Sequence, residues 1–170
     1  MRASCLTGLV AAALLAPAAA YAQVARSRPA PVVEITAGHA GFIDDVNIDH
    51  ALVGGAARVY LTPRLSVGPE IQYMVGPGED RDLIVTGNLT FDLFRPGRRF
   101  TPYLVAGGGL FRHSNVYSGQ AFSRTEGAFT GGAGLRAWLG DRVYVAPEAR
   151  IGWEAHYRFS ATVGVSLPRR

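Results

Sequence analysis

Apolar and polar residues alternate along most of the chain after residue 31. The segment 127–154 shows this best, because the odd positions of its two halves, 127–139 and 143–153, are apolar or small while its even positions include Arg136, Glu148 and Arg150. A period of two is typical of β-strands, in which successive side chains point to opposite faces. The pattern predicts eight strands, at residues 33–41, 51–61, 65–75, 82–93, 101–112, 127–139, 143–154 and 157–167.

The lengths of these segments and of their connections favour a membrane barrel. Most predicted strands have about ten residues, close to the roughly 9–11 residues of a tilted transmembrane strand. Short connections at 62–64, 94–100 and 140–142 alternate with longer polar ones at 42–50, 76–81 and 113–126. Transmembrane barrels have short periplasmic turns and longer outer loops. The sequence therefore predicts an all-β fold, a closed eight-stranded antiparallel up-and-down transmembrane β-barrel.

The expected strand register explains how long polar side chains fit inside such a barrel. With Leu61 opposite Leu65 across a three-residue turn, Val59 faces Val67 and Glu70 faces Ala56. In the segment 127–154, the same register places Glu148 opposite Gly134 and Arg150 opposite Gly132. A long side chain thus faces a residue with almost none, which leaves room in a narrow interior.

The even positions carry the charges, and we expect them to face the interior. Buried charges need partners because their desolvation costs several kcal/mol. Four acids and four bases balance one another in this set, with Tyr60, Trp138 and Tyr144 as further interior residues. The predicted interior polar ladder is Glu34, Arg58, Glu70, Gln72, Asn88, Asp92, Arg136, Glu148, Arg150 and Arg158.

The odd positions are apolar, and we expect them to face lipid. Aromatic residues near the predicted strand ends, among them Tyr103, Phe111 and Trp153, suggest membrane-interface belts. An alternative is a soluble periplasmic barrel of lipocalin type, which would turn the odd face inward to hold an apolar ligand. The predicted lipid-facing residues include Leu65, Val67, Ile71, Leu83, Val85, Leu89, Phe91, Leu135, Ile151, Phe159, Val163 and Val165.

Composition and charge narrow the picture further. The 170 residues suit one domain, the net charge is +4, and every basic residue is arginine. No basic cluster beyond residues 95–99 supports nucleic-acid binding. Residues 1–22 have the short positive start, apolar run and A-x-A cleavage site of a secretory signal peptide, and they hold the only cysteine, Cys5. We expect a flexible lead-in at 23–31 and the barrel at 32–170.

Three phrases carry a family resemblance: VYLTPRLSVGPE at 59–70, PYLVAGGGL at 102–110 and ATVGVSL at 161–167. With the leader and eight strands, they resemble small outer-membrane β-barrel proteins of the OmpA/OmpX-like type. The resemblance implies a monomer in the bacterial outer membrane, in contact with membrane lipid and lipopolysaccharide. The chain departs from the family pattern by ending without an aromatic residue. Pro69 and Pro147 also fall within strands, where we expect β-bulges.

Candidate chemistry is sparse, and we expect no enzymatic activity, no cofactor and no metal. Some outer-membrane barrels deacylate lipid A with a histidine and a serine on one strand face. Here His113 and Ser114 are adjacent and would point to opposite faces of a strand. His39, His50 and His156 lack the spacing of a metal site. A deacylase-like enzyme is thus a minor alternative.

The remaining candidate for function is the connection 113–126, predicted to be an exposed outer loop. Loops on a rigid scaffold commonly carry binding functions. Its polar and aromatic side chains suit contact with surface sugars or a protein partner, and we expect the barrel to be no wide pore. The candidate interaction residues are Asn115, Tyr117, Gln120, Phe122 and Arg124.

Overall fold

The computed structural model describes residues 29–43, 47–153 and 155–168. The predicted signal peptide and most of the predicted lead-in lie outside the described residues. No helix in the described part of the chain is long and apolar enough to cross a bilayer. The fold consists of strands, whose bounds are β1 Val32–Ile43, β2 Asn47–Tyr60, β3 Leu65–Val75, β4 Arg81–Asp92, β5 Phe100–Tyr117, β6 Gln120–Trp138, β7 Val143–Gly152 and β8 His156–Ser166.

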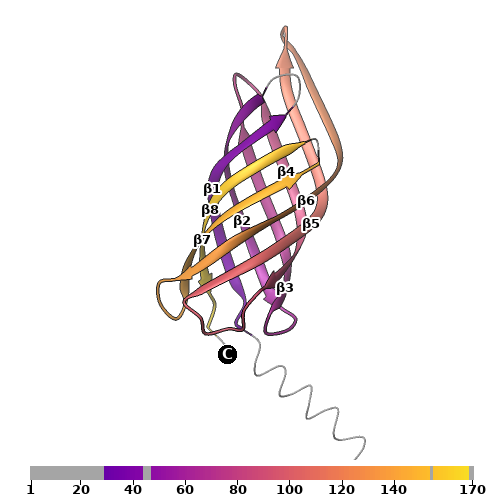
Figure 1. Cartoon of the computed structure of the whole chain (residues 1–170). Helices are drawn as coiled ribbons and strands as arrows, with labels where there is room; N and C mark the ends of the chain where they lie inside the picture. Colours follow the sequence, from indigo (N-terminus) through magenta and orange to yellow (C-terminus); the bar gives the residue numbers. More distant parts are fainter. Residues whose placement is uncertain (1–28, 44–46, 154, 169–170) are drawn as a thin grey trace, which may run out of the picture.

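These strands form one closed barrel, as the sequence predicts (Figure 1). Each strand pairs antiparallel with its neighbour in the chain, and β1 closes the sheet by pairing with β8 from Val32–Ser166 to Phe42–His156. Closure leaves no sheet edge with unpaired backbone groups, which is the condition for strands to span lipid.

The two ends of the barrel differ. The described chain begins and ends at one end, here called the proximal end, which also carries the turns β2–β3, β4–β5 and β6–β7 (Figure 1). The opposite, distal end carries the β3–β4 connection and the long β5–β6 hairpin, which rises above the other strands (Figure 1). The predicted alternation of short and long connections is not found, because the distal connections β3–β4 and β5–β6 have five and two residues, whereas β4–β5 at the proximal end has seven, residues 93–99.

The predicted register is found in two hairpins. Val59 pairs with Val67 and Ala56 with Glu70 between β2 and β3. Between β6 and β7, Gly132 pairs with Arg150 and Gly134 with Glu148. Each glycine leaves space that a side chain of the neighbouring strand uses, and a Cβ atom at Gly132 would collide with β7.

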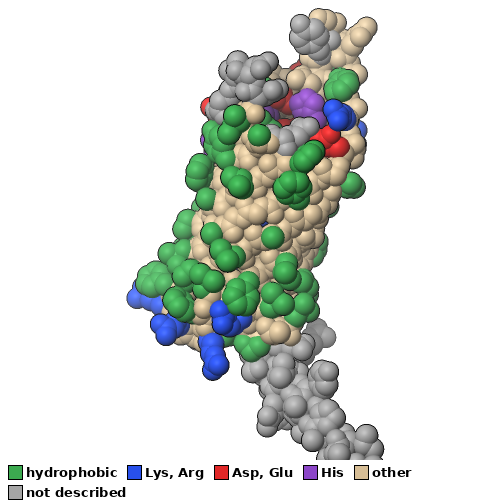
Figure 2. All heavy atoms as spheres, turned by 45° about the vertical axis from the view of Figure 1, so that its right-hand side comes forward, with side chains coloured by type: hydrophobic (Ala, Val, Ile, Leu, Met, Phe, Trp, Pro, Cys, Tyr) green, Lys and Arg blue, Asp and Glu red, His purple; other side chains and the backbone are tan. Residues whose placement is uncertain are grey.

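The predicted apolar face points outward. Ile71, Val85 and Ile151 are among the exposed large hydrophobic residues, which are spread over the barrel wall (Figure 2). The soluble lipocalin-like alternative required these side chains to point inward. The barrel therefore has the inverted arrangement of a membrane protein, with apolar side chains outside.

Strand β5 departs from the expected parity, because its odd residues face inward. Tyr103 pairs with Asp92 of β4 and with Gly134 of β6, and it is 1% exposed. Phe111, on the same face, is also buried. The prediction that Tyr103 and Phe111 belong to lipid-facing aromatic belts is therefore wrong. The even residue Leu104 points outward instead and is exposed.

Turn length explains this inversion. Leu61 and Leu65 bond across three intervening residues, an odd number that keeps parity between β2 and β3. Leu93 and Pro102 bond across eight intervening residues, 94–101. Because this number is even, inward-facing residues have even numbers in β4 and odd numbers in β5. The two-residue turn between β5 and β6 exchanges odd and even again, so the even residues of β6 face inward.

The proline residues do not form the predicted bulges. On both sides of Pro69 the β2–β3 pairs keep one register, from Ala56–Glu70 to Val59–Val67, so no extra residue is inserted. The β6–β7 pairs likewise keep one register around Pro147, from Gly134–Glu148 to Ala137–Val145. A proline lacks only the backbone donor, so the ladder loses local bonds without slipping.

The segment predicted as the loop 113–126 is mostly strand. β5 and β6 remain paired from Phe100–Ala137 up to Tyr117–Gln120, and only Ser118 and Gly119 form the turn. Both turn residues have positive φ, 52° and 78°, as a two-residue hairpin turn of type I′ requires. The distal structure is therefore a projecting β-hairpin and not a flexible loop.

Candidate functional site

The interior of the barrel contains a network of charged side chains from facing strands. Arg58 of β2 donates to Glu34 of β1 over 2.7 Å and to the Thr90 hydroxyl of β4 over 3.0 Å. The Tyr144 hydroxyl of β7 donates to the other oxygen of Glu34. Arg136 of β6 pairs with Asp92 of β4. The network therefore crosses the lumen near the proximal end.

A second part of the network is centred on Arg150 of β7. Its guanidinium contacts Glu148 at 2.6 Å and reaches across the barrel to Glu70 of β3 at 2.8 Å. Arg158 of β8 also contacts Glu70, at 3.4 Å, and donates to Gln72. Each of these charges is buried and faces an opposite charge, an arrangement that offsets much of the desolvation cost.

The structure places all ten residues of the predicted ladder in this network. Nine are buried, while Asn88 is half-buried and receives a long 3.5 Å contact from Arg150. Sequence reasoning missed Tyr103, whose hydroxyl donates to Glu148 over 2.8 Å. The sequence pattern assigns only even positions to the interior. Tyr103 has an odd number, but the inverted parity of β5 turns its side chain inward.

Apolar clusters lie inside the barrel toward both ends of the charged network. The proximal cluster contains Tyr60, Tyr103 and Tyr144, against which the half-buried Trp138 packs. The distal cluster has Leu52, Met74, Ile84 and Phe111, with Phe42 packed against it. In the proximal cluster the charges and the aromatic rings are in direct contact, since Arg136 lies over the rings of Tyr103 and Tyr144.

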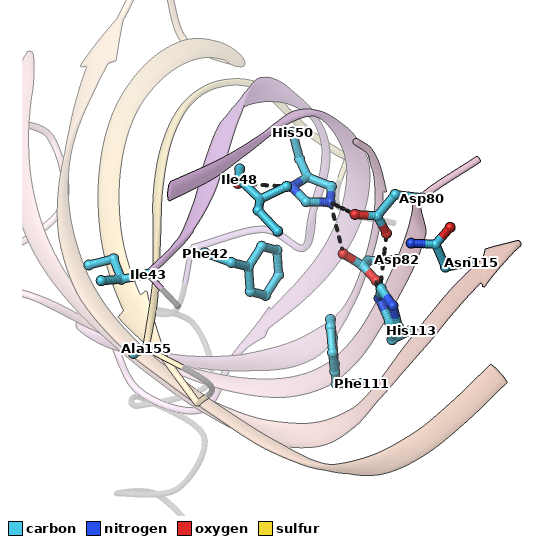
Figure 3. Close-up of a pocket in the computed structure, with 10 residues that line it drawn as sticks. All are labelled: Phe42, Ile43, Ile48, His50, Asp80, Asp82, Phe111, His113, Asn115 and Ala155. Carbon is cyan, nitrogen blue, oxygen red and sulfur yellow. Dashed lines mark hydrogen bonds and ion pairs between the residues drawn. The ribbon is translucent and has the colours of Figure 1, made fainter. Parts of the chain in front are cut away.

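Above the distal cluster, the barrel opens into a pocket of about 540 Å³ (Figure 3). Two histidines and two aspartates meet there: His50 from β2, Asp80 from the β3–β4 connection, Asp82 from the start of β4, and His113 from β5. Nε2 of His50 lies 3.1 Å from Asp80 and 3.2 Å from Asp82. Nδ1 of His113 lies 2.7 Å from Asp82 and 3.5 Å from Asp80.

Three of these residues, His50, Asp80 and Asp82, place a potential metal-ligand atom each within 4.8 Å of the others. The expectation that His50 belongs to no metal-site pattern considered only spacing along the chain. His50 lies on β2, whereas both aspartates lie at the start of β4 or just before it, so only the folded barrel brings the histidine to the carboxylates. The acidic and histidine side chains are visible at the distal opening (Figure 2).

The predicted interaction residues share one face of the β5–β6 hairpin. Tyr117 pairs with Gln120, Asn115 with Phe122, and His113 with Arg124. Directly paired residues lie on the same face, and this face continues that of Phe111 and the lumen. Asn115 lines the pocket, whereas Gln120, Phe122 and Arg124 are exposed; the side chain of Tyr117 lies outside the described residues.

His113 and Ser114 point to opposite sides of this hairpin. His113 binds Asp82 inside, while the Ser114 hydroxyl faces that of Ser123 at 3.4 Å. The histidine–serine pair of a deacylase-like enzyme is therefore not assembled by these two residues, since a nucleophile and its base must lie within hydrogen-bond reach.

Comparisons with solved structures place the fold among small outer-membrane barrels. Neisserial surface protein A is 16% identical, with a TM-score of 0.71 over 81% of this chain and 97% of that one. The N-terminal β-barrel domain of Pseudomonas aeruginosa OprF is 17% identical, with a TM-score of 0.63 over 80% and 97%. Ail of Yersinia pestis is 15% identical, with a TM-score of 0.53 over 82% and 97%.

At the sequence level, no curated protein matches the chain. The family model described as "outer membrane protein beta-barrel domain" matches residues 8–167, which include all eight strands. The apolar outer wall and closed sheet agree with that match. The chain belongs to the outer membrane protein beta-barrel domain family.

Proposed function

We propose that this protein is a non-enzymatic outer-membrane barrel that presents the β5–β6 hairpin at the cell surface for binding. The observation that carries the proposal is the shared face of the hairpin. A phenyl ring, amides and a guanidinium, from Phe122, Asn115, Gln120 and Arg124, stand side by side on a rigid two-stranded element. Aromatic, amide and arginine side chains suit contact with sugar rings and acidic groups.

The orientation follows from export. Residues 1–22 would direct the chain to the periplasm and be removed, and the mature barrel would insert with its proximal turns in the periplasm. The projecting hairpin would then extend beyond the bilayer, where lipopolysaccharide and external molecules are its neighbours. Because the eight strands of one chain close the sheet, a single copy can act as a complete barrel.

The interior supports a role as scaffold and not as wide pore. Arg136, Tyr103 and Tyr144 are among its largest fully buried side chains, and they lie in the proximal half. The Tyr103 hydroxyl donates to Glu148, which links this layer to the ion pairs of Arg150. An eight-stranded barrel has an interior that side chains can just fill.

The test shortens the hairpin without disturbing the barrel. Because Ser114 pairs with Ser123 and Tyr117 with Gln120, removing residues 114–117 and 120–123 deletes four facing pairs and keeps the Ser118–Gly119 turn. Cells producing this variant should lose binding to an immobilised panel of lipopolysaccharides and other glycans that the parent protein binds.

Point variants provide the matched controls. Phe122→Ala and Arg124→Ala, on the proposed binding face, should each weaken binding several-fold. Val116→Ala and Ser123→Ala, on the opposite face of the same hairpin, should leave it unchanged. Equal binding by the shortened variant and the parent protein would refute the proposal.

A further inference from the structure

We propose that His50, Asp80 and Asp82 form a binding site for a divalent transition-metal ion at the distal mouth of the barrel, with Zn²⁺ the best match. His113 would hold Asp82 in place from the other side. The three ligands lie inside the barrel wall and not on the hairpin, although His113 and Asn115 connect the pocket to the hairpin face proposed above for binding.

The geometry of the three residues suits a small cation. The Nε2 atom of His50 lies 3.1 and 3.2 Å from one oxygen each of Asp80 and Asp82. Tetrahedral zinc with bonds of about 2.0–2.2 Å separates its ligand atoms by roughly 3.3–3.5 Å. A metal could therefore enter between these atoms after movements of a few tenths of an ångström.

The backbone fixes which nitrogen of His50 is available. Nδ1 of His50 lies 3.2 Å from the carbonyl oxygen of Ile48, which can only accept a hydrogen bond, so Nδ1 carries the proton. The other ring nitrogen, Nε2, then faces one oxygen each of Asp80 and Asp82, where a metal ion could bind it.

The carboxylates are also short of cationic partners. The ion pairs of Asp80 and Asp82 among the described residues involve only His50 and His113. The neighbouring Arg81 instead donates to backbone carbonyls, including that of Gly78 at 3.0 Å. In the interior network, by contrast, each acid of the predicted ladder contacts an arginine.

One carboxylate oxygen remains unused. Asp80 is 6% exposed, and its buried Oδ1 atom has no hydrogen-bond partner; the nearest cationic group is His113 at 3.5 Å. A buried acceptor without a partner costs about 1–3 kcal/mol, and more when it is charged. A cation bound between His50 and Oδ2 of Asp80 would neutralise the carboxylate to which this atom belongs and so reduce that cost.

His113 fits the part of a ligand-orienting residue. Its Nδ1 atom contacts Oδ1 of Asp82 at 2.7 Å, whereas His50 faces Oδ2 of the same carboxylate. Partners of this kind orient metal ligands in proteins. His113 is partly exposed, and the pocket in front of it leaves a fourth coordination position for water or a ligand atom (Figure 3).

The ligand set selects the class of metal. One imidazole and two carboxylates favour Zn²⁺ and neighbouring transition metals, because Ca²⁺ and Mg²⁺ prefer sites made only of oxygen atoms. The apolar side chains of Phe42 and Phe111 form the lower wall of the pocket (Figure 3). Such surroundings exclude water below the site and strengthen electrostatic binding.

The experiment measures Zn²⁺ binding by titration calorimetry to the untagged barrel extracted from outer membranes in detergent. We expect one Zn²⁺ ion per barrel. His50→Gln and Asp80→Asn should each weaken binding at least tenfold. His113→Gln should weaken it about 10–100-fold, the usual effect of losing a residue that orients a ligand. Co²⁺ should give visible absorption bands with the parent barrel and lose them with His50→Gln.

A second histidine–aspartate pair at the same end of the barrel provides the control. His39 lies 3.3 Å from Asp49, but both side chains are exposed. His39→Gln should leave Zn²⁺ affinity unchanged, and heat-modifiable gel migration should show that all variants are folded. Absence of stoichiometric binding to the folded parent barrel would overturn the proposal. Equal losses in His39→Gln and His50→Gln would also overturn it.

Discussion

At the scale of single residues, the barrel separates two kinds of charge pair. Arg150 is buried between Glu148 and Glu70 and compensates the charge of both, with a further contact to Glu70 from Arg158. Arg124 pairs with Glu126 at 3.0 Å, but its side chain is 67% exposed. Water and salt screen the second pair, whereas the first is protected from both.

This contrast predicts unequal effects of removing the guanidinium. Arg150→Met leaves the buried Glu148 without an arginine and Glu70 with only the longer contact to Arg158, and it should lower the free energy of unfolding by about 3–5 kcal/mol. Arg124→Met should change it by no more than about 1 kcal/mol. Urea unfolding of both variants in lipid vesicles, followed by tryptophan fluorescence, measures the difference. Equal midpoints would contradict the assigned role of Arg150.

The interior ladder could be anticipated from the sequence because charged residues recur on one parity of apolar strands. The pocket at the distal end could not be anticipated from the sequence. His50 and Asp80 are separated by thirty residues, and they meet because the β3–β4 connection lies beside the start of β2 at that end. Metal-site motifs in sequences depend on short spacing along the chain, whereas this cluster depends on which strands the closed sheet makes neighbours.

At the scale of elements, strand β5 shows most clearly why the sequence pattern alone does not predict which residues face the interior. Its parity depends on the number of residues in two turns, and alternation alone does not report it, since Leu104 and Val105 are both apolar. The projecting part of the hairpin escaped prediction for another reason. A strand beyond the bilayer has water on both faces, so it carries no apolar alternation and resembles a loop in composition.

The inverted parity of β5 is directly testable with single cysteines. We expect Leu104→Cys to react with a lipid-soluble maleimide in outer-membrane vesicles, because this position is 51% exposed on the outer wall. Val105→Cys should be protected, since it is 4% exposed inside the barrel. Val67→Cys, outward on an odd position of β3, is the positive control. Reversed labelling of 104 and 105 would show that β5 keeps the parity of its neighbours.

At the scale of the whole molecule, closure and filling act together. The β1–β8 ladder completes the wall, and the charged network links strands on opposite sides of it. Arginines at the proximal rim stack on aromatic rings, as Arg64 does on Phe91 at 4.5 Å. The exposed basic side chains gather at this end (Figure 2). Such groups suit the level of the lipid headgroups.

A filled interior predicts that the barrel passes no sugars. Liposomes containing the protein should swell in isotonic arabinose no faster than protein-free liposomes, because an eight-stranded barrel has no space left once its side chains are in place. Liposomes with a general porin provide the positive control. Swelling that slows with increasing sugar size would reveal an open channel and contradict this prediction.

The charged interior also has a consequence for how the protein enters a membrane. An open sheet of a few strands would expose Arg58, Glu70 or Arg150 directly to hydrocarbon, where an unpaired charge is strongly unfavourable. Apart from Glu148, which lies on β7 with Arg150, their partners lie on other strands, some on the far side of the barrel. Strands are therefore unable to insert stably one at a time. Insertion and the final pairing of β1 with β8 must proceed as one coupled event.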